Sequence, residues 1–144
     1  RAFPQTTIIL DHVGFPLGIG PYADKRDQVF ATWRNSLNEL AKCENVVVKI
    51  GGMGMDVFGF GFEKRKTPAS SEELAKAWKP FVDVCVEAFG VKRAMFESNF
   101  PVDKVSCSYK VLWNAFKRVA AGYSKDEKAA LFHDTAARVY RLAQ

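Results

Sequence analysis

The sequence predicts an α/β fold in which three parallel strands are each followed by a loop and a helix. Three short β-prone runs, at residues 6–10, 46–50 and 94–96, alternate with longer segments whose apolar residues recur at helical spacing. Such alternation is typical of a parallel sheet, because each helix returns the chain to the end where the previous strand began. The carboxyl ends of the three strands are therefore expected on one side of the sheet, around one pocket.

The first unit delivers a histidine to the end of its strand. Residues 6–10 lead into Asp11 and His12, and a loop rich in glycine and proline follows. Apolar residues at 27–41 recur every three or four positions, which predicts a helix with one buried face. Because parallel α/β proteins present ligands and bases at strand ends, His12 is a candidate site residue. Strand alternation predicts Asp11 on the opposite face, as a structural acid.

The second unit combines a buried strand with a long loop. Residues 46–50 are largely β-branched, as a strand covered on both faces requires, and two glycines end the run. Residues 51–69 hold glycines, aromatic residues and then charges without a period, and loops of this length are usually functional or mobile. Ser70 and Glu73 have capping-box spacing and predict a helix start, and Gly90 predicts its end.

The third unit begins with a short strand at 94–96, which ends in the sequence ESNFP. A helix is predicted around residues 111–119 from its apolar spacing. Ser124 and Glu127 form a second capping-box pair, and Asp134 is expected to cap a last helix.

Composition narrows the class of protein. The 144 residues are 48% hydrophobic and suit a single domain over residues 1–144. The net charge of +5 is spread among 16 acids without a long basic run, which argues against nucleic-acid binding. Apolar runs stay well short of the roughly 18 residues that a membrane span needs, no signal peptide is recognisable, and the three cysteines lack metal-site spacing. These features predict a cytoplasmic protein with free thiols.

Four segments together resemble the amidohydrolase-related family of metal-dependent-hydrolase-like TIM-barrel proteins, which includes dicarboxylate lactonases and sugar lactonases. They cover nearly the whole chain in a specific order: LDHVGFP, NELAKCENVVVKIGGMGM, FGVKRAMFESNFPVDK and FHDTAARVYRL. The resemblance implies that the three strands are strands six to eight of a (β/α)8 TIM barrel, so that the chain is its C-terminal part. The preceding five units, with the paired histidines that bind metal, would then lie outside it.

The resemblance also implies roles for individual residues. His12 matches a histidine that in relatives coordinates metal or contacts the substrate carbonyl. Asn99 takes the place of an aspartate that handles the proton of the attacking water; an amide cannot accept that proton, but it can orient water or stabilise an oxyanion. Asp103 is a weaker catalytic candidate, since a loop acid or helix cap is commoner. A divalent metal, zinc before others, is expected to be weakly held by His12 or absent.

Four further residues are candidates for substrate binding. Arg26, Arg65 and Lys104 follow three different strands and are expected to bind the carboxylates of a small acidic substrate, although each alone is more often a solvent-exposed charge. Met53 lies in a glycine-rich stretch that lacks the nucleotide-binding motifs and is expected to form an apolar wall.

The leading interpretation is a hydrolase that acts on a lactone or other ester-like carbonyl of a small organic acid, with the fragment alone inactive. A related decarboxylase is one alternative. Another is a non-catalytic α/β module or a self-associating half barrel, because a three-stranded sheet leaves edges and apolar side chains uncovered.

Overall fold

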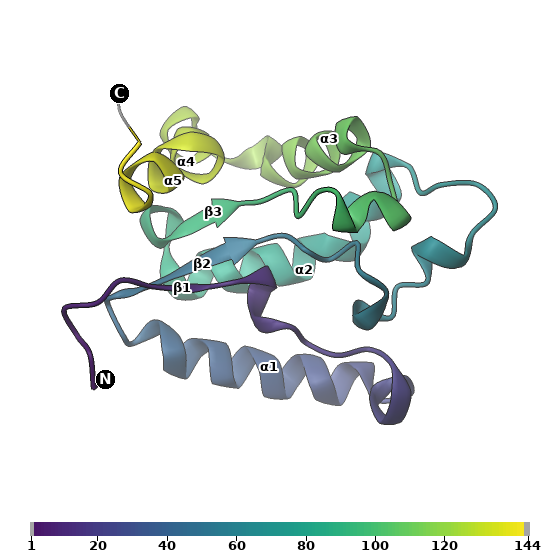
Figure 1. The fold of residues 1–144 in the computed structure, drawn as a ribbon, viewed down its shortest axis with the longest axis horizontal. Helices are drawn as coiled ribbons and strands as arrows, with labels where there is room; N and C mark the ends of the chain where they lie inside the picture. Colours follow the sequence, from purple (N-terminus) through teal and green to yellow (C-terminus); the bar gives the residue numbers. More distant parts are fainter. Residues whose placement is uncertain (1, 143–144) are drawn as a thin grey trace.

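Three parallel strands form the sheet of the computed structural model, which describes residues 2–142 (Figure 1). They are β1 (Ile8–Leu10), β2 (Val46–Ile50) and β3 (Ala94–Phe96), and β2 lies between the other two. Val48 pairs with Leu10 on one side and with Ala94 on the other. The predicted α/β fold is confirmed, with a first strand that starts two residues later than expected.

Helices surround this sheet. Figure 1 shows α1 running below the strands, α2 behind them and α3 above β3. The bounds are α1 Arg26–Ala41, α2 Ser71–Phe89, α3 Tyr109–Val119, α4 Lys125–Ala129 and α5 Thr135–Val139. A π-helical turn, Ala130–Asp134, joins α4 to α5. Among residues 2–142, no helix is both long enough and apolar enough to cross a lipid bilayer.

The helix starts follow the predicted capping chemistry in two of three places. The hydroxyls of Ser70 and Ser124 accept from the backbone three residues on, and the carboxylates of Glu73 and Glu127 bond back to the cap backbone. The prediction for Asp134 is wrong. Its backbone is helical (φ −64°, ψ −39°) because the π-helical turn continues the chain into α5 without a break, and its carboxylate instead contacts the adjacent His133.

The main apolar core lies between the sheet and the helices. From β2, Val46, Val48 and Ile50 join it, as side-chain alternation requires. Phe96 of β3 stacks on Phe116 of α3 with ring centroids 4.4 Å apart. Val47, on the other face of β2, is also buried but lies outside this cluster. One face of β2 therefore packs in the main apolar core with the helices, and the opposite face lies outside that core.

The loop after β2 packs against the loop after β1. A Cβ atom on Gly18 would lie 2.2 Å from the carbonyl oxygen of Phe58, so only glycine allows this approach. The backbone N–H of Gly18 donates to Val57, which ties the two loops together. The long loop that the sequence left without regular structure contains short helical turns at Asp56–Phe58 and Phe62–Lys64.

Candidate active site

His12 leaves β1 in a conformation that aims its ring across the sheet. Its φ of 52° lies in the left-handed region, as do those of Val13 and Phe15. Nonglycine residues in this region store backbone strain, which is concentrated at functional sites. The imidazole Nδ1 lies 2.5 Å from Oε1 of Glu97, and the backbone N–H of His12 donates to the same oxygen at 3.2 Å. The end of β1 is therefore joined to the end of β3.

Lys49 connects Glu97 to the acid beside the histidine. Its Nζ lies 2.9 Å from Oε2 of Glu97 and 3.1 Å from Oδ1 of Asp11. Burial alone would lower the pKa of Lys49, but the hydrogen bonds to Glu97 and Asp11 outweigh it and raise this pKa. The expectation that Asp11 and His12 lie on opposite faces is wrong, because the left-handed turn at His12 ends the strand alternation. Both belong to one network with Lys49 and Glu97.

Three glycines after β2 allow the strand ends to meet. A Cβ atom on Gly51 would lie 2.4 Å from Glu97, and one on Gly52 would lie 2.7 Å from Nδ1 of His12. A Cβ on Gly54 would lie 2.8 Å from the carboxyl carbon of Asp103. These distances are too short for any real side chain, so the backbone after β2 passes directly against site residues from both neighbouring strands.

Asp103 is held in the interior of the turn after β3. Its side chain is fully buried, and its Oδ2 accepts from the backbone N–H of Gly54 at 3.0 Å. Its Oδ1 accepts from Nδ2 of Asn99 at 2.7 Å. Burial raises the pKa of Asp103 to about 6, even though both hydrogen bonds lower it; Glu97 adds to the rise, and His12 opposes it.

The contact between His12 and Glu97 has a defined chemical consequence. A carboxylate accepts hydrogen bonds only, so it favours the tautomer with the proton on Nδ1. The lone pair of the imidazole is then on Nε2, where it can take a proton from water or bind a cation. The ring is partly accessible, with 20% of the side chain exposed, so an incoming molecule can reach it.

Within residues 2–142, no group of three or more His, Cys, Asp or Glu side chains could hold a metal ion. His12 offers Nε2, but Glu97 is bonded through both oxygens to His12 and Lys49. The two oxygens of Asp103 face Gly54 and Asn99. These residues therefore do not fit a complete zinc site by themselves.

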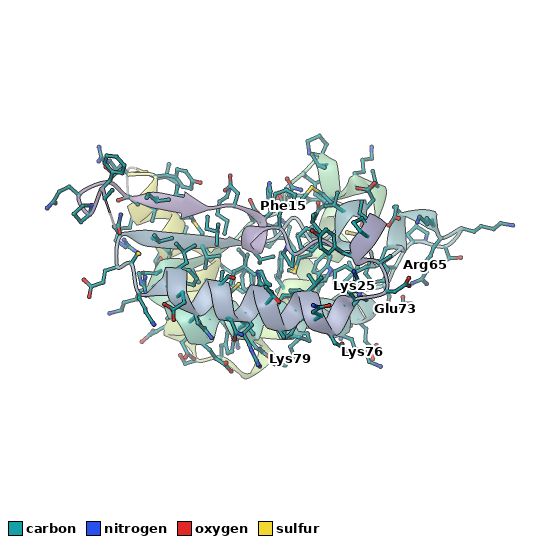
Figure 2. All side chains as sticks on the ribbon, turned by 90° about the horizontal axis from the view of Figure 1, so that it is seen from below. Phe15, Lys25, Arg65, Glu73, Lys76 and Lys79 are labelled. Carbon is teal, nitrogen blue, oxygen red and sulfur yellow. The ribbon has the colours of Figure 1, made fainter. Side chains whose placement is uncertain are left out.

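The four predicted substrate-binding residues have different surroundings. Arg26 donates to the carbonyl oxygens of Phe58 and Gly59, and Met53 is buried in the main core. Arg65 pairs with Glu73 at 2.8 Å, and Figure 2 shows this pair at one end of the molecule, apart from Phe15 and the β1 end. Of the predicted catalytic residues, Asn99 and Asp103 are hydrogen-bonded to each other, and Gly52 and Gly54 of one loop pack against His12 and Asp103.

Three hollows of the described surface are lined by residues other than His12 and Asp103. Arg65 and Lys104 both line one of about 340 Å³. Two others, of about 290 and 410 Å³, lie between the loop after β1 and helix α1, and share Pro16, Leu17 and Val29. Neither His12 nor Asp103 lines any of these three. The ends of β1 and β3 meet, as predicted, in the contact between His12 and Glu97.

Two functional candidates were missed by the sequence reasoning. Glu97 follows β3 directly, and its place at a strand end was the same signal that singled out His12. Lys49 could not be assigned to a face from its sequence alone. Both contacts bridge strands that are far apart along the chain, with Glu97 85 residues beyond His12.

Comparison with known proteins gives consistent relatives. The sequence profile of the amidohydrolase family matches residues 1–142. The uncharacterized protein y4mH of Sinorhizobium fredii is 42% identical over 142 residues, which are 99% of this chain and 41% of that protein. An L-fucono-1,5-lactonase of Burkholderia multivorans is 32% identical over 138 residues, covering 95% of this chain and 44% of the lactonase.

Solved structures agree with these sequences. Two crystal structures of an amidohydrolase from Burkholderia multivorans, one with bound HEPES and one with bound zinc, match with TM-scores of 0.80 and 0.79. Each is 31% identical to this chain and is matched over 99% of this chain and 48% of its own. The chain thus spans less than half the length of these relatives.

Proposed function

We propose, since the chain belongs to the amidohydrolase family, that it forms the histidine-bearing part of a site that hydrolyses the lactone of a small organic acid. The observation that carries this proposal is the 2.5 Å contact between Nδ1 of His12 and Glu97, which joins the ends of β1 and β3 across β2. The 32% identity with an L-fucono-1,5-lactonase supports the lactone as the substrate class. In this proposal, β1, β2 and β3 are the last three strands of a (β/α)8 barrel in a longer protein.

The proposed reaction uses His12 as the base. Nε2 takes a proton from a water molecule as its oxygen attacks the lactone carbonyl, and Glu97 stabilises the imidazolium that forms. The tetrahedral intermediate then collapses, the ring C–O bond breaks, and the proton passes from Nε2 to the departing oxygen. The product is a hydroxy acid. Lys49 binds Oε2 of Glu97 and so keeps Oε1 directed at the imidazole.

Asn99 is assigned a supporting part in this reaction. An amide cannot accept the proton of the attacking water, which is why the base is placed at His12. An amide can hold water or a developing oxyanion through hydrogen bonds. Zinc would need a longer protein that adds ligands, because the described residues supply an incomplete ligand set.

The test compares two histidine variants in a longer protein that carries this segment. Hydrolysis of L-fucono-1,5-lactone and of an unsubstituted δ-lactone is followed by acid release in a pH-stat. His12→Gln is expected to lower kcat by roughly 10²- to 10⁴-fold, the usual contribution of a general base. His133→Gln is the matched control, because His133 is exposed and its Nδ1 contacts the adjacent Asp134.

Equal turnover by the two variants would refute the role of His12. An absence of turnover on any lactone by the unaltered longer protein would refute the substrate class. Circular dichroism and urea unfolding of both variants would separate these results from loss of folding.

A further inference from the structure

The carboxylate of Asp103 is fully buried, yet every polar contact it makes is directed at the site. Oδ2 accepts from the Gly54 backbone, and Oδ1 accepts from the side chain of Asn99. The hydroxyl of Ser106 donates to the carbonyl oxygen of Gly54 at 2.5 Å and fixes the same peptide. A buried acid is costly unless its hydrogen bonds are satisfied, and here they are satisfied by loops after two different strands.

These contacts decide which way the Asn99 amide is turned. A carboxylate can only accept, so the edge of the amide that faces Asp103 must be the NH₂ edge. The amide is planar, and its oxygen is therefore turned away from Asp103. Asn99 is only half-buried, and no group among residues 2–142 donates to its Oδ1. Among the described residues, the oxygen is thus left without a donor.

The backbone reinforces this orientation. Asn99 has a φ of 50°, which asparagine tolerates better than most residues. The backbone N–H of Asp103 donates to the carbonyl oxygen of Asn99 at 3.1 Å, so the two residues are joined by main chain and side chain. Gly54 has no Cβ that would displace the carboxylate. Rotation of the amide would have to break the partly buried hydrogen bond to Asp103.

We propose that Asp103 is a positioning residue that locks the Asn99 carboxamide with its oxygen toward the reacting water. Asn99 then accepts a hydrogen bond from the water and orients it, while His12 takes the proton. This inference rests on the proposed hydrolysis and deepens it. The amide oxygen of Asn99 accepts a hydrogen bond as a carboxylate oxygen would at this strand end, but it cannot take the proton. Asp103 itself touches no substrate.

The first test needs no activity and uses the 144-residue chain. In ¹⁵N–¹H NMR, the side-chain NH₂ of Asn99, assigned by its loss in Asn99→Asp, is expected to exchange with solvent more than about tenfold more slowly than that of the exposed Asn38, because it is hydrogen-bonded to a buried group. Asp103→Asn should abolish this protection. In that variant the new amide keeps its oxygen on Gly54 and presents NH₂ to Asn99, which must then turn its own NH₂ outward.

The second test is a swap measured in the longer, lactone-hydrolysing protein. Asp103→Asn is expected to lower kcat by about 10²-fold, the usual effect of a misplaced reacting group, and to leave KM little changed. The double variant Asn99→Asp/Asp103→Asn should recover most of this loss. A carboxylate at position 99 can accept from the new amide with one oxygen and still offer the other to water.

The outcomes are distinct. Equal exchange of the Asn99 and Asn38 amides in the unaltered chain would overturn the lock, whatever the activity. A double variant no faster than Asp103→Asn would show that Asp103 acts only as a structural acid and would overturn its positioning role. If no lactone is hydrolysed by the unaltered protein, the proposed function fails, while the exchange measurement still decides the orientation of the amide.

Discussion

The helix side of β2 buries Val46, Val48 and Ile50 in the main apolar cluster, whereas the opposite side carries Val47 and then Lys49. Successive residues of one strand thus serve two regions. On the helix side, packing depends on shape and apolar area. On the opposite side, the strand end is tied to its neighbours by charges that reach from Asp11 to Glu97.

The two sides of β2 thus separate apolar packing, which stabilises the fold, from the charged groups of the candidate site. Apolar packing stabilises the chain at every pH, because no titrating group takes part in it. The polar side holds a fully buried acid and a half-buried lysine, whose burial opposes their charged forms. Substitutions on the two sides should therefore change stability by different amounts, with a different pH dependence and with a different second substitution that restores it.

The largest effect is expected on the helix side. Phe116 is fully buried and contacts both Phe96 and Trp78. Phe116→Ala should lower the free energy of unfolding by about 3 to 5 kcal/mol, because it removes a large apolar group and leaves a cavity. Urea unfolding measures this loss. Val105→Ala, at a side chain that is 60% exposed, is the control, and a comparable loss there would contradict the assignment of the core.

The next effect belongs to Asp103 and depends on pH. Its pKa is about 6 in the folded chain against the ordinary value of 3.8, so the folded state binds the proton more tightly than the unfolded state. The stability that the protonated acid contributes is present below pH 3.8 and is lost as pH rises toward 6. Relative to Asp103→Asn, the unaltered chain should therefore lose about 3 kcal/mol across this range.

Urea unfolding of both chains at several pH values from 4 to 7 would give this difference. Subtracting the free energy of unfolding of one chain from that of the other cancels the contribution of the other carboxyl groups that titrate in the same pH window. A difference that stays flat, or that moves in favour of the unaltered chain as pH rises, would mean that Asp103 is not held in a desolvated site.

The helix side was the part that sequence could predict. Apolar periodicity and capping patterns depend on residues close together in the sequence. The structure therefore has the predicted capping box at Ser70 and Glu73 and the predicted strand at 94–96. Asp134 failed because helical conformation continues through it by a π-helical turn, which a capping pattern does not reveal. Local signals specify an element well where it begins at a cap, and poorly where two helices join.

The polar side was predicted only in outline. Strand-end position singled out His12, and the resemblance added Asn99, but their partners come from distant segments. The strand-end position of Glu97 was visible in the sequence, but its contact with His12 depends on the left-handed turn at His12, which no local pattern of nonglycine residues predicts. Arg26 was proposed for substrate from its charge, whereas in the structure it holds two loop carbonyl groups.

A smaller effect is expected for Glu97→Gln. This change keeps an acceptor for the His12 backbone but leaves the half-buried Lys49 with Asp11 as its remaining acid. The loss in free energy of unfolding should be about 2 kcal/mol, within the range for an uncompensated charged hydrogen bond. Adding Lys49→Met should recover part of it, because the unpaired charge is removed. A double variant less stable than Glu97→Gln would mean that the unpaired charge of Lys49 is not what destabilises Glu97→Gln.

The smallest effect is expected for Asp11→Asn, on the same lysine. The Asp11 side chain is 57% exposed, against 9% for Glu97, so water screens its attraction to Lys49. The free energy of unfolding should change by about 0.5 kcal/mol, and 0.5 M salt should remove most of this change. Both acids contact one ammonium group at similar distances, so the two variants compare an exposed with a buried partner of Lys49, although Glu97 also binds His12. A loss for Asp11→Asn equal to that for Glu97→Gln would show that exposure does not set the strength of this network, and that the two acids share the charge of Lys49 evenly.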